Sequence, residues 1–178
     1  MLDHIAVRSD ARTHDAHADY TSSYRATAAC TRELARLHEE IAASLTDARV
    51  MTDVGIPDEP VVRRSPARCL VQLGPVALTV AWLQRAQGTV ADGELLVVVW
   101  RGEVAVRTPQ GFERAHQHSG ASSATAIWES VLVVAAESET EWGWAPPGAK
   151  GDALSSAALA HRCADRLRAA YTECTRER

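Results

Sequence analysis

Two histidines lie in apolar helical patterns where an imidazole could take part in chemistry. His38 stands among Leu34, Leu37 and Ile41, and His161 flanks an alanine-rich repeat near the C-terminus. Because imidazole titrates near neutral pH, a buried histidine can act as an acid, a base or a ligand. The simpler interpretation of His38 is a core residue that bonds a backbone carbonyl. If the two helices packed together, His38 and His161 could meet in one site.

The five tryptophans are the most unusual feature of the composition, because the chain has only one phenylalanine. Trp82, Trp100 and Trp128 fall in segments with strand-like patterns. Core packing is the simpler interpretation of such residues. The functional interpretation is a recognition surface or the lining of a ligand cavity, where tryptophan is enriched. We take Trp82, Trp100, Trp128, His38 and His161 as the candidate residues for binding a ligand or a partner.

No catalytic or metal-binding motif is complete. Asp10, His14 and His17 have helical spacing, but no further ligand is predicted to close a metal site around them. His116 and His118 alternate in a polar loop. The 143–150 segment has the glycine spacing of a phosphate-binding loop, but it lacks the Gly-Lys-Ser/Thr ending and contains two prolines. We therefore predict no catalytic residue, no metal and no cofactor. Whether the protein is an enzyme stays open, and the lack of a complete motif favours one that is not.

The bulk composition excludes several classes of partner and location. Hydrophobic residues make up 46% of the chain and charged residues 24%, as in a globular domain. The net charge of −4 gives no support for binding nucleic acid. No apolar run approaches the roughly 18 residues of a membrane helix, and the N-terminus does not resemble a signal peptide. The cysteines form no C-x-x-C pair, and the chain has one lysine and no asparagine. We expect a bacterial cytoplasmic protein.

The chain reads as a single α+β domain over residues 1–178. Steps of three and four between apolar residues predict a long N-terminal helix, and an alanine stripe predicts a C-terminal one. Prolines break the pattern after the first helix, and a β-rich region follows. The expected segments are an arm at 1–12, a helix at 13–48, a connector at 49–66, an antiparallel sheet at 67–145 and a helix at 152–175.

The strand at 76–84 has one large and one small face. Val76, Leu78, Val80 and Trp82 alternate with mostly small residues at the odd positions. Small side chains allow a helix to approach closely, so we expect a helix over the odd face. The strand at 94–101 is apolar on both faces, which is typical of a central strand or of one that meets a partner chain. Further strands are expected at 69–73, 103–108, 124–136 and 141–145, and residues 129–130 are expected to form a bulge in the strand at 124–136.

These elements predict an antiparallel sheet of about five strands with both helices packed on one face. The other face would then need a cover, and a second copy of the chain or a partner protein would supply it. The leading hypothesis for function is a non-enzymatic protein-interaction or assembly module that forms a homodimer or binds a partner through this apolar face. The alternative is a small-molecule-binding domain with a cavity between the sheet and the C-terminal helix.

Overall fold

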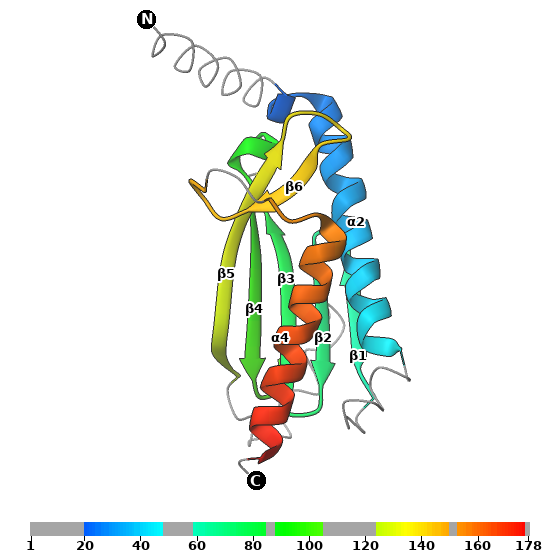
Figure 1. The fold of residues 1–178 in the computed structure, drawn as a ribbon, viewed down its shortest axis with the longest axis vertical. Coiled ribbons are helices and arrows are strands. Elements are labelled where there is room, and N and C mark those ends of the chain that lie inside the picture. The colour runs from blue at the N-terminus through cyan, green and yellow to red at the C-terminus, as the bar shows by residue number, and fades with distance from the viewer. Residues whose placement is uncertain (1–19, 48–58, 85–87, 105–123, 150–152, 177–178) are drawn as a thin grey trace, which may run out of the picture.

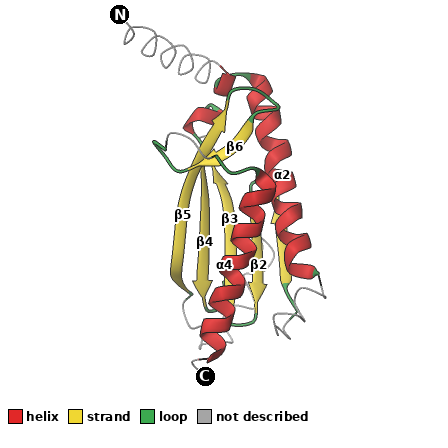
Figure 2. Ribbon diagram, viewed as in Figure 1, coloured by secondary structure: helices red, strands yellow, loops and turns green. Residues whose placement is uncertain are grey.

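Two helices cover one face of a six-stranded antiparallel sheet in the computed structural model of the chain (Figures 1 and 2). The structure describes residues 20–47, 59–84, 88–104, 124–149 and 153–176. The strands follow one another across the sheet in chain order, and each pairs antiparallel with the next. The predicted α+β class with both helices on one face is therefore confirmed.

The elements run in the order helix, sheet, helix. One short 3₁₀ turn, η1 (Val90–Asp92), stands between β3 and β4. The helices are α2 (Tyr24–Thr46) and α4 (Ser156–Arg176). The strands are β1 (Val61–Ser65), β2 (Arg68–Leu73), β3 (Val76–Leu83), β4 (Glu94–Arg101), β5 (Thr125–Ala136) and β6 (Trp142–Ala145).

The sheet has one strand more than the five or so expected, because β1 lies in the segment predicted to be a connector. Val61 to Ser65 pairs with β2 in register, with Val61 opposite Gln72. Pro60 and Pro66 stand at its two ends. Proline is tolerated at the ends of an edge strand, where its missing N–H removes no ladder hydrogen bond. The two prolines therefore stand at the ends of a short strand. The prediction of a connector at 49–66 was wrong for residues 61–65.

Helix α2 is shorter than the predicted 13–48 segment. Tyr20 and Thr21 are helical, but the chain turns at the next two serines and α2 begins after Ser23. The Ser23 Oγ accepts a hydrogen bond from the Ala26 N–H at 3.2 Å, which caps the helix. In one continuous helix the step of four from Tyr20 would place Tyr24 on the apolar face. The break shifts that face, and Tyr24 is 87% exposed. Residues 1–19 and 48 lie outside the described part.

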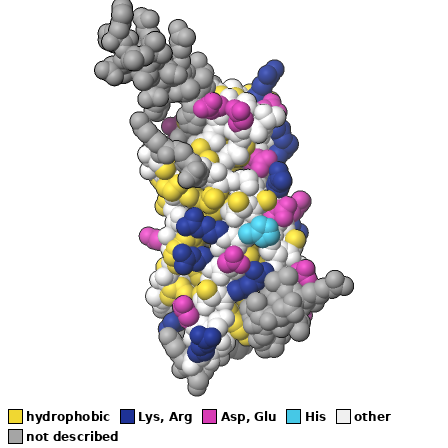
Figure 3. Space-filling view, in the orientation of Figure 1, with side chains coloured by type: hydrophobic (Ala, Val, Ile, Leu, Met, Phe, Trp, Pro, Cys, Tyr) yellow, Lys and Arg dark blue, Asp and Glu magenta, His cyan; other side chains and the backbone are white. Residues whose placement is uncertain are grey.

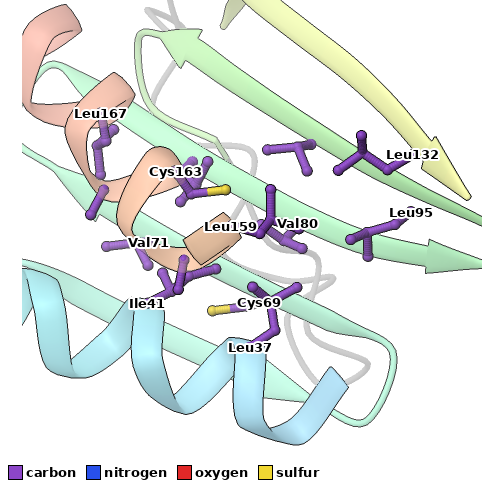
Figure 4. Packing of buried hydrophobic residues seen from close by; sticks show 14 of the residues in the cluster. Leu37, Ile41, Cys69, Val71, Val80, Leu95, Leu132, Leu159, Cys163 and Leu167 are labelled. Carbon is purple, nitrogen blue, oxygen red and sulfur yellow. The ribbon is translucent and has the colours of Figure 1, made fainter. Parts of the chain in front are cut away.

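The core lies between the helices and the large-residue face of the sheet, which corrects the prediction that a helix would cover the small face of β3. Val76, Leu78 and Val80 are fully buried in one cluster with residues of α2 and α4. The alanine stripe of α4 provides the small partners, because small helix residues let the helix settle between large sheet residues. Figure 4 shows this packing, with Leu159, Cys163 and Leu167 of α4, Leu37 and Ile41 of α2, and Cys69, Val71, Val80, Leu95 and Leu132 of the sheet.

Polar side chains tie the two helices to each other and to β6. The buried Trp144 Nε1 donates to the Ser156 Oγ at 3.0 Å, and that hydroxyl donates to the Glu33 Oε2 at 2.6 Å. At the other end of the helix pair, Arg168 donates to the Ser44 carbonyl. These bonds satisfy buried polar groups that would otherwise be costly, and they fix α4 against α2.

The remaining strand predictions are confirmed in part. Glu103 and Val104 are not in a strand, and the rest of the predicted 103–108 strand lies outside the described residues. A bulge does occur in β5, but it lies near Ile127, since Trp100 pairs with Ala126 and the preceding residue of β4 pairs with Trp128. Helix α4 begins at Ser156, and the N-cap predicted for it at residue 152 also lies outside the described part.

Candidate interaction surface

The sheet face that points away from the helices is called the second face here. The register of the strands defines its rows, because directly opposite residues point to the same side. Its residues are Val61, Arg63 and Ser65 of β1, Arg68, Leu70 and Gln72 of β2, Ala77, Thr79, Ala81 and Leu83 of β3, Glu94, Leu96, Val98 and Trp100 of β4, and Ala126, Glu129 and Val131 of β5.

This face carries exposed apolar side chains. Val61 is 52%, Leu83 48% and Val131 36% exposed, and Leu96 and Trp100 are half-buried. Leu70 and Val98, in the middle of the face, are only 5% and 3% exposed, so the exposed apolar side chains lie toward its margins. Both described helices lie on the opposite side of the sheet, and no described strand crosses the second face (Figure 1). Apolar area gathered on one face of a sheet is typical of a surface that contacts another protein.

Trp100 is the one candidate tryptophan on the second face. Its Nε1 donates to the Thr79 Oγ1 at 3.0 Å, and it stands opposite Ala77 in the register. The hydroxyl therefore satisfies the indole N–H while the ring covers the small residues of β3. The small odd positions of β3, expected to seat a helix, instead accommodate this indole.

Gln72 holds the end of the second face beside Trp100, a role for which the sequence pattern carries no signal. Its amide nitrogen donates to the carbonyls of Gly74 at 2.8 Å and Val76 at 3.0 Å. Its Oε1 accepts from the Val104 N–H at 3.2 Å. One side chain thus joins the β2–β3 turn to the segment that follows β4, which fixes the structure of this end of the face.

Trp82 belongs to an aromatic cluster on the helix side. Its ring lies 5.9 Å from the ring of Trp144 in an edge-to-face arrangement, and Trp142 lies at the same distance from Trp144. The Trp82 Nε1 donates to the Gln84 Oε1 at 3.1 Å. Trp142 and Trp144 alternate along β6 and so lie on one face, and the cluster packs against the core. Trp82 thus contributes to packing here.

Trp128 also lies on the helix side, but at the rim. It is half-buried, and the Arg166 guanidinium of α4 stands 5.5 Å from its ring centre. A cation over an indole face is favourable. The sequence offered no signal for this pair, because the two residues are far apart in the chain. On this side of the molecule, basic and acidic side chains are interspersed with apolar ones (Figure 3).

The two candidate histidines have different surroundings. His38 is 4% exposed, and its Nε2 has no hydrogen-bond partner. Burial, with a smaller contribution from the positive charge of Arg64, lowers the pKa of His38 to about 4. His161 is exposed on α4. The two imidazoles therefore do not share a buried site. A buried, neutral His38 matches the interpretation of a core histidine, but its Nε2 does not make the hydrogen bond expected of one.

The four cysteines are buried and none is in a disulfide. Burial raises the pKa of Cys30 and Cys163 to about 12 and that of Cys69 to about 11. The thiolate is the reactive form of cysteine. These three thiols therefore remain protonated at neutral pH and do not provide nucleophiles.

Metal-ligating side chains do not gather within the described residues: no group of three or more His, Cys, Asp or Glu could hold an ion there. The spaced residues Asp10, His14 and His17, and the pair His116 and His118, lie outside that part of the chain. None of the helices described is long and apolar enough to cross a membrane.

Comparison with known proteins adds no assignment. No family model, no curated protein and no solved structure matches the chain. A function for this chain must therefore be argued from the geometry of the second face and of the sheet edges.

Proposed function

We propose that this protein is a non-enzymatic interaction module that self-associates or binds a partner protein through the second face of its sheet. The observation that carries the proposal is that both helices occupy one side of the sheet while Val61, Leu83 and Val131 remain exposed on the other. Burying such side chains against a partner removes apolar area from water, at roughly 25 cal/mol per Å².

The packing on the helix side favours this proposal over the alternative of a small-molecule cavity beneath α4. Leu159, Cys163 and Leu167 point into the space between α4 and the sheet and are at most 2% exposed. They contact the large residues of the strands in one continuous cluster (Figure 4). A ligand there would have to displace core side chains. Ligand binding would appear as a rise in melting temperature on addition of the compound.

The proposed setting is the cytoplasm of a bacterium. The free state of all four cysteines supports it, because thiols stay reduced in that compartment. The mixed charges of the helix side and the net charge of −4 favour a protein partner over nucleic acid.

The test replaces exposed apolar residues of the second face with lysine. The double variant Val61→Lys with Leu83→Lys places two charges on that face, at sites 52% and 48% exposed, so that folding is unaffected. Protein purified gently from its source organism is then studied by native mass spectrometry and light scattering. We expect a mass above that of the single 19.2 kDa chain for the parent. The double variant should bind its partner at least about tenfold more weakly, because the two introduced lysine charges would be buried in the interface without an opposite charge beside them.

The matched control is Tyr24→Lys, which introduces the same charge at an 87% exposed aromatic residue on α2. This variant should keep the assembly of the parent. Equal assembly in all three proteins, or a single-chain mass for the parent at micromolar concentration, would contradict the proposal.

A further inference from the structure

The first half of β5 is an unpaired sheet edge among the described residues. On its inner side, β5 pairs with β4 from Thr125 to Leu132. On its outer side, β6 pairs with it only from Val133 to Ala136. The backbone of Thr125 to Leu132 therefore faces outward without a described strand beside it, at the left side of the sheet in Figure 1. Much of this stretch is exposed, including Ile127 at 39%.

The other edges of the sheet are protected. β6 is closed by an antiparallel bridge in which Trp144 and Leu154 exchange two backbone hydrogen bonds of 2.8 Å. β1 has only five residues, two of which are exposed arginines, and prolines stand at both ends. Short length, charge and proline are the devices by which edges avoid pairing. The free part of β5 is longer, has no proline and carries Glu129 as its one charge.

This edge is complementary to itself in an antiparallel register centred on Trp128. Opposite residues must share a face, and Ile127 is left out as the bulge residue. With Trp128 opposite the partner's Trp128, Glu129 stands opposite the partner's Ala126, and Ser130 opposite the partner's Thr125. Glu129 meets no like charge, an aromatic pair forms at the two-fold axis beside the Arg166 guanidinium of each copy, and a Ser130–Thr125 hydroxyl pair lies on each side of the axis. Centring the ladder on Glu129 would instead oppose two carboxylates.

The register also leaves room for β6. Val131 would lie opposite the partner's Ala124, so the pairing ends before Val133, where β6 joins β5. The two-fold axis would be perpendicular to the sheet. Both helix pairs would then lie on the same side, and both second faces on the other.

We infer that a second copy of this chain pairs with the free edge of β5, which joins two six-stranded sheets into one of twelve strands. The inference deepens the proposed function: it rests on the proposal that the chain is an assembly module, but it does not depend on the second face being the interface. It leaves exposed side chains of the second face, Val61 and Leu83 among them, free in both copies for a further partner. Main-chain hydrogen bonds between the two β5 strands would provide the affinity, as in other cases of strand addition.

The test is disulfide trapping with two single-cysteine additions, Thr125→Cys and Ser130→Cys. The paired positions would bring the Cα atoms within the roughly 4.4–6.8 Å that a disulfide requires. Under mild oxidation, a mixture of the two full-length variants should give about tenfold more covalent dimer than either variant alone, since only the mixture places unlike positions opposite each other. The four native cysteines are buried and remain as the common background.

A second variant keeps the test independent of oxidation. Ser130→Lys places a lysine in the middle of the free edge and should weaken the dimer about tenfold in light scattering, because lysine on an edge strand is one of the devices that prevent strand pairing. Circular dichroism confirms that each variant is folded. A monomer at all concentrations, or a dimer in which the mixture traps no more than the single variants, overturns the inference.

The outcomes separate the edge from the second face. Trapping that persists in the Val61→Lys, Leu83→Lys background, with assembly unchanged, supports the edge pairing and contradicts the second-face proposal. If the Val61→Lys, Leu83→Lys variant loses assembly while the Ser130→Lys variant retains it, the second face is the interface and the edge pairing is overturned.

Discussion

His38 is the buried titratable side chain with the clearest consequence for stability. It lies on the inner side of α2 with an unpartnered Nε2, near the positive charge of Arg64. The protonated imidazole would be buried without a compensating anion among these neighbours, so the folded protein favours the neutral form.

This pKa shift predicts a loss of stability in acid. The pKa of His38 is about 4 in the folded protein, compared with the ordinary histidine value of 6.5 that applies to the unfolded chain. Between these values the unfolded chain binds a proton that the folded protein excludes. The free energy of unfolding should therefore fall as the pH drops from 6.5 through 4, by on the order of 3 kcal/mol in total. Urea titrations at several pH values measure this directly.

His38→Leu is the control for the pH dependence. Leucine cannot titrate and fills a similar volume, so the variant should lose less stability across the same pH interval. An identical decline in both proteins would show that another group causes it.

The residue types gave part of this picture in advance. The apolar neighbours of His38 in the sequence place it in the core, as found. The neighbour that repels its proton, Arg64, comes from β1, and the cation over Trp128 comes from α4. Such pairs depend on how distant segments pack, which local periodicity does not encode. The sequence likewise does not reveal which tryptophans lie on the core side and which one on the second face.

At the scale of elements, Gly93 determines how η1 and β4 meet the aromatic cluster. A Cβ on Gly93 would lie 2.1 Å from the Trp82 Cζ2, far inside van der Waals contact. The indole lies against the glycine, and this close approach requires the absence of a side chain.

Gly93→Ala should therefore lower the free energy of unfolding by about 1–3 kcal/mol, because the Trp82 ring must move within a packed cluster. Chemical denaturation provides the measurement. In the double variant with Trp82→Leu, the smaller side chain relieves the clash, so the two substitutions should cost less together than the sum of their separate effects. Strict additivity would contradict the proposed contact.

Element types were predictable from the sequence, but two placements were not. Alternation identified β3 and showed that its faces differ in size, yet size alone did not tell which face a helix would cover. Helices with small residues pack against the large face, because that arrangement buries the most apolar area. Likewise, the valines of β1 form a strand only because β2 offers a free edge beside Pro60 and Pro66, a tertiary effect that overrides local composition.

At the scale of the whole molecule, protection of backbone amides should follow the layers. The strands β2, β3 and β4 lie between neighbours on both sides and beneath the helices, whereas β1 and the first half of β5 lie at the edges. Amides exchange slowly where opening requires breaking the core. In dilute protein, mass-spectrometric hydrogen exchange should be fast in 61–65 and 125–131 and slowest in 68–83 and 94–101.

The same measurement at higher concentration should slow exchange in 125–131 and leave 61–65 unchanged, since only the former edge is expected to gain a partner strand. Concentration-dependent protection at β1, with none at β5, would instead place self-association at the opposite edge.

The order of the elements along the chain has a consequence for biosynthesis. Each strand pairs with the strand made just before it, so the sheet can grow hairpin by hairpin as the chain is synthesised. Helix α4 follows all six strands, and its residues cover the middle of the helix-side face. Until it emerges from the ribosome, Val80 and Leu95 lack their final cover. The nascent sheet then exposes an apolar surface on each side, and this is the stage of its life at which the protein most depends on chaperones.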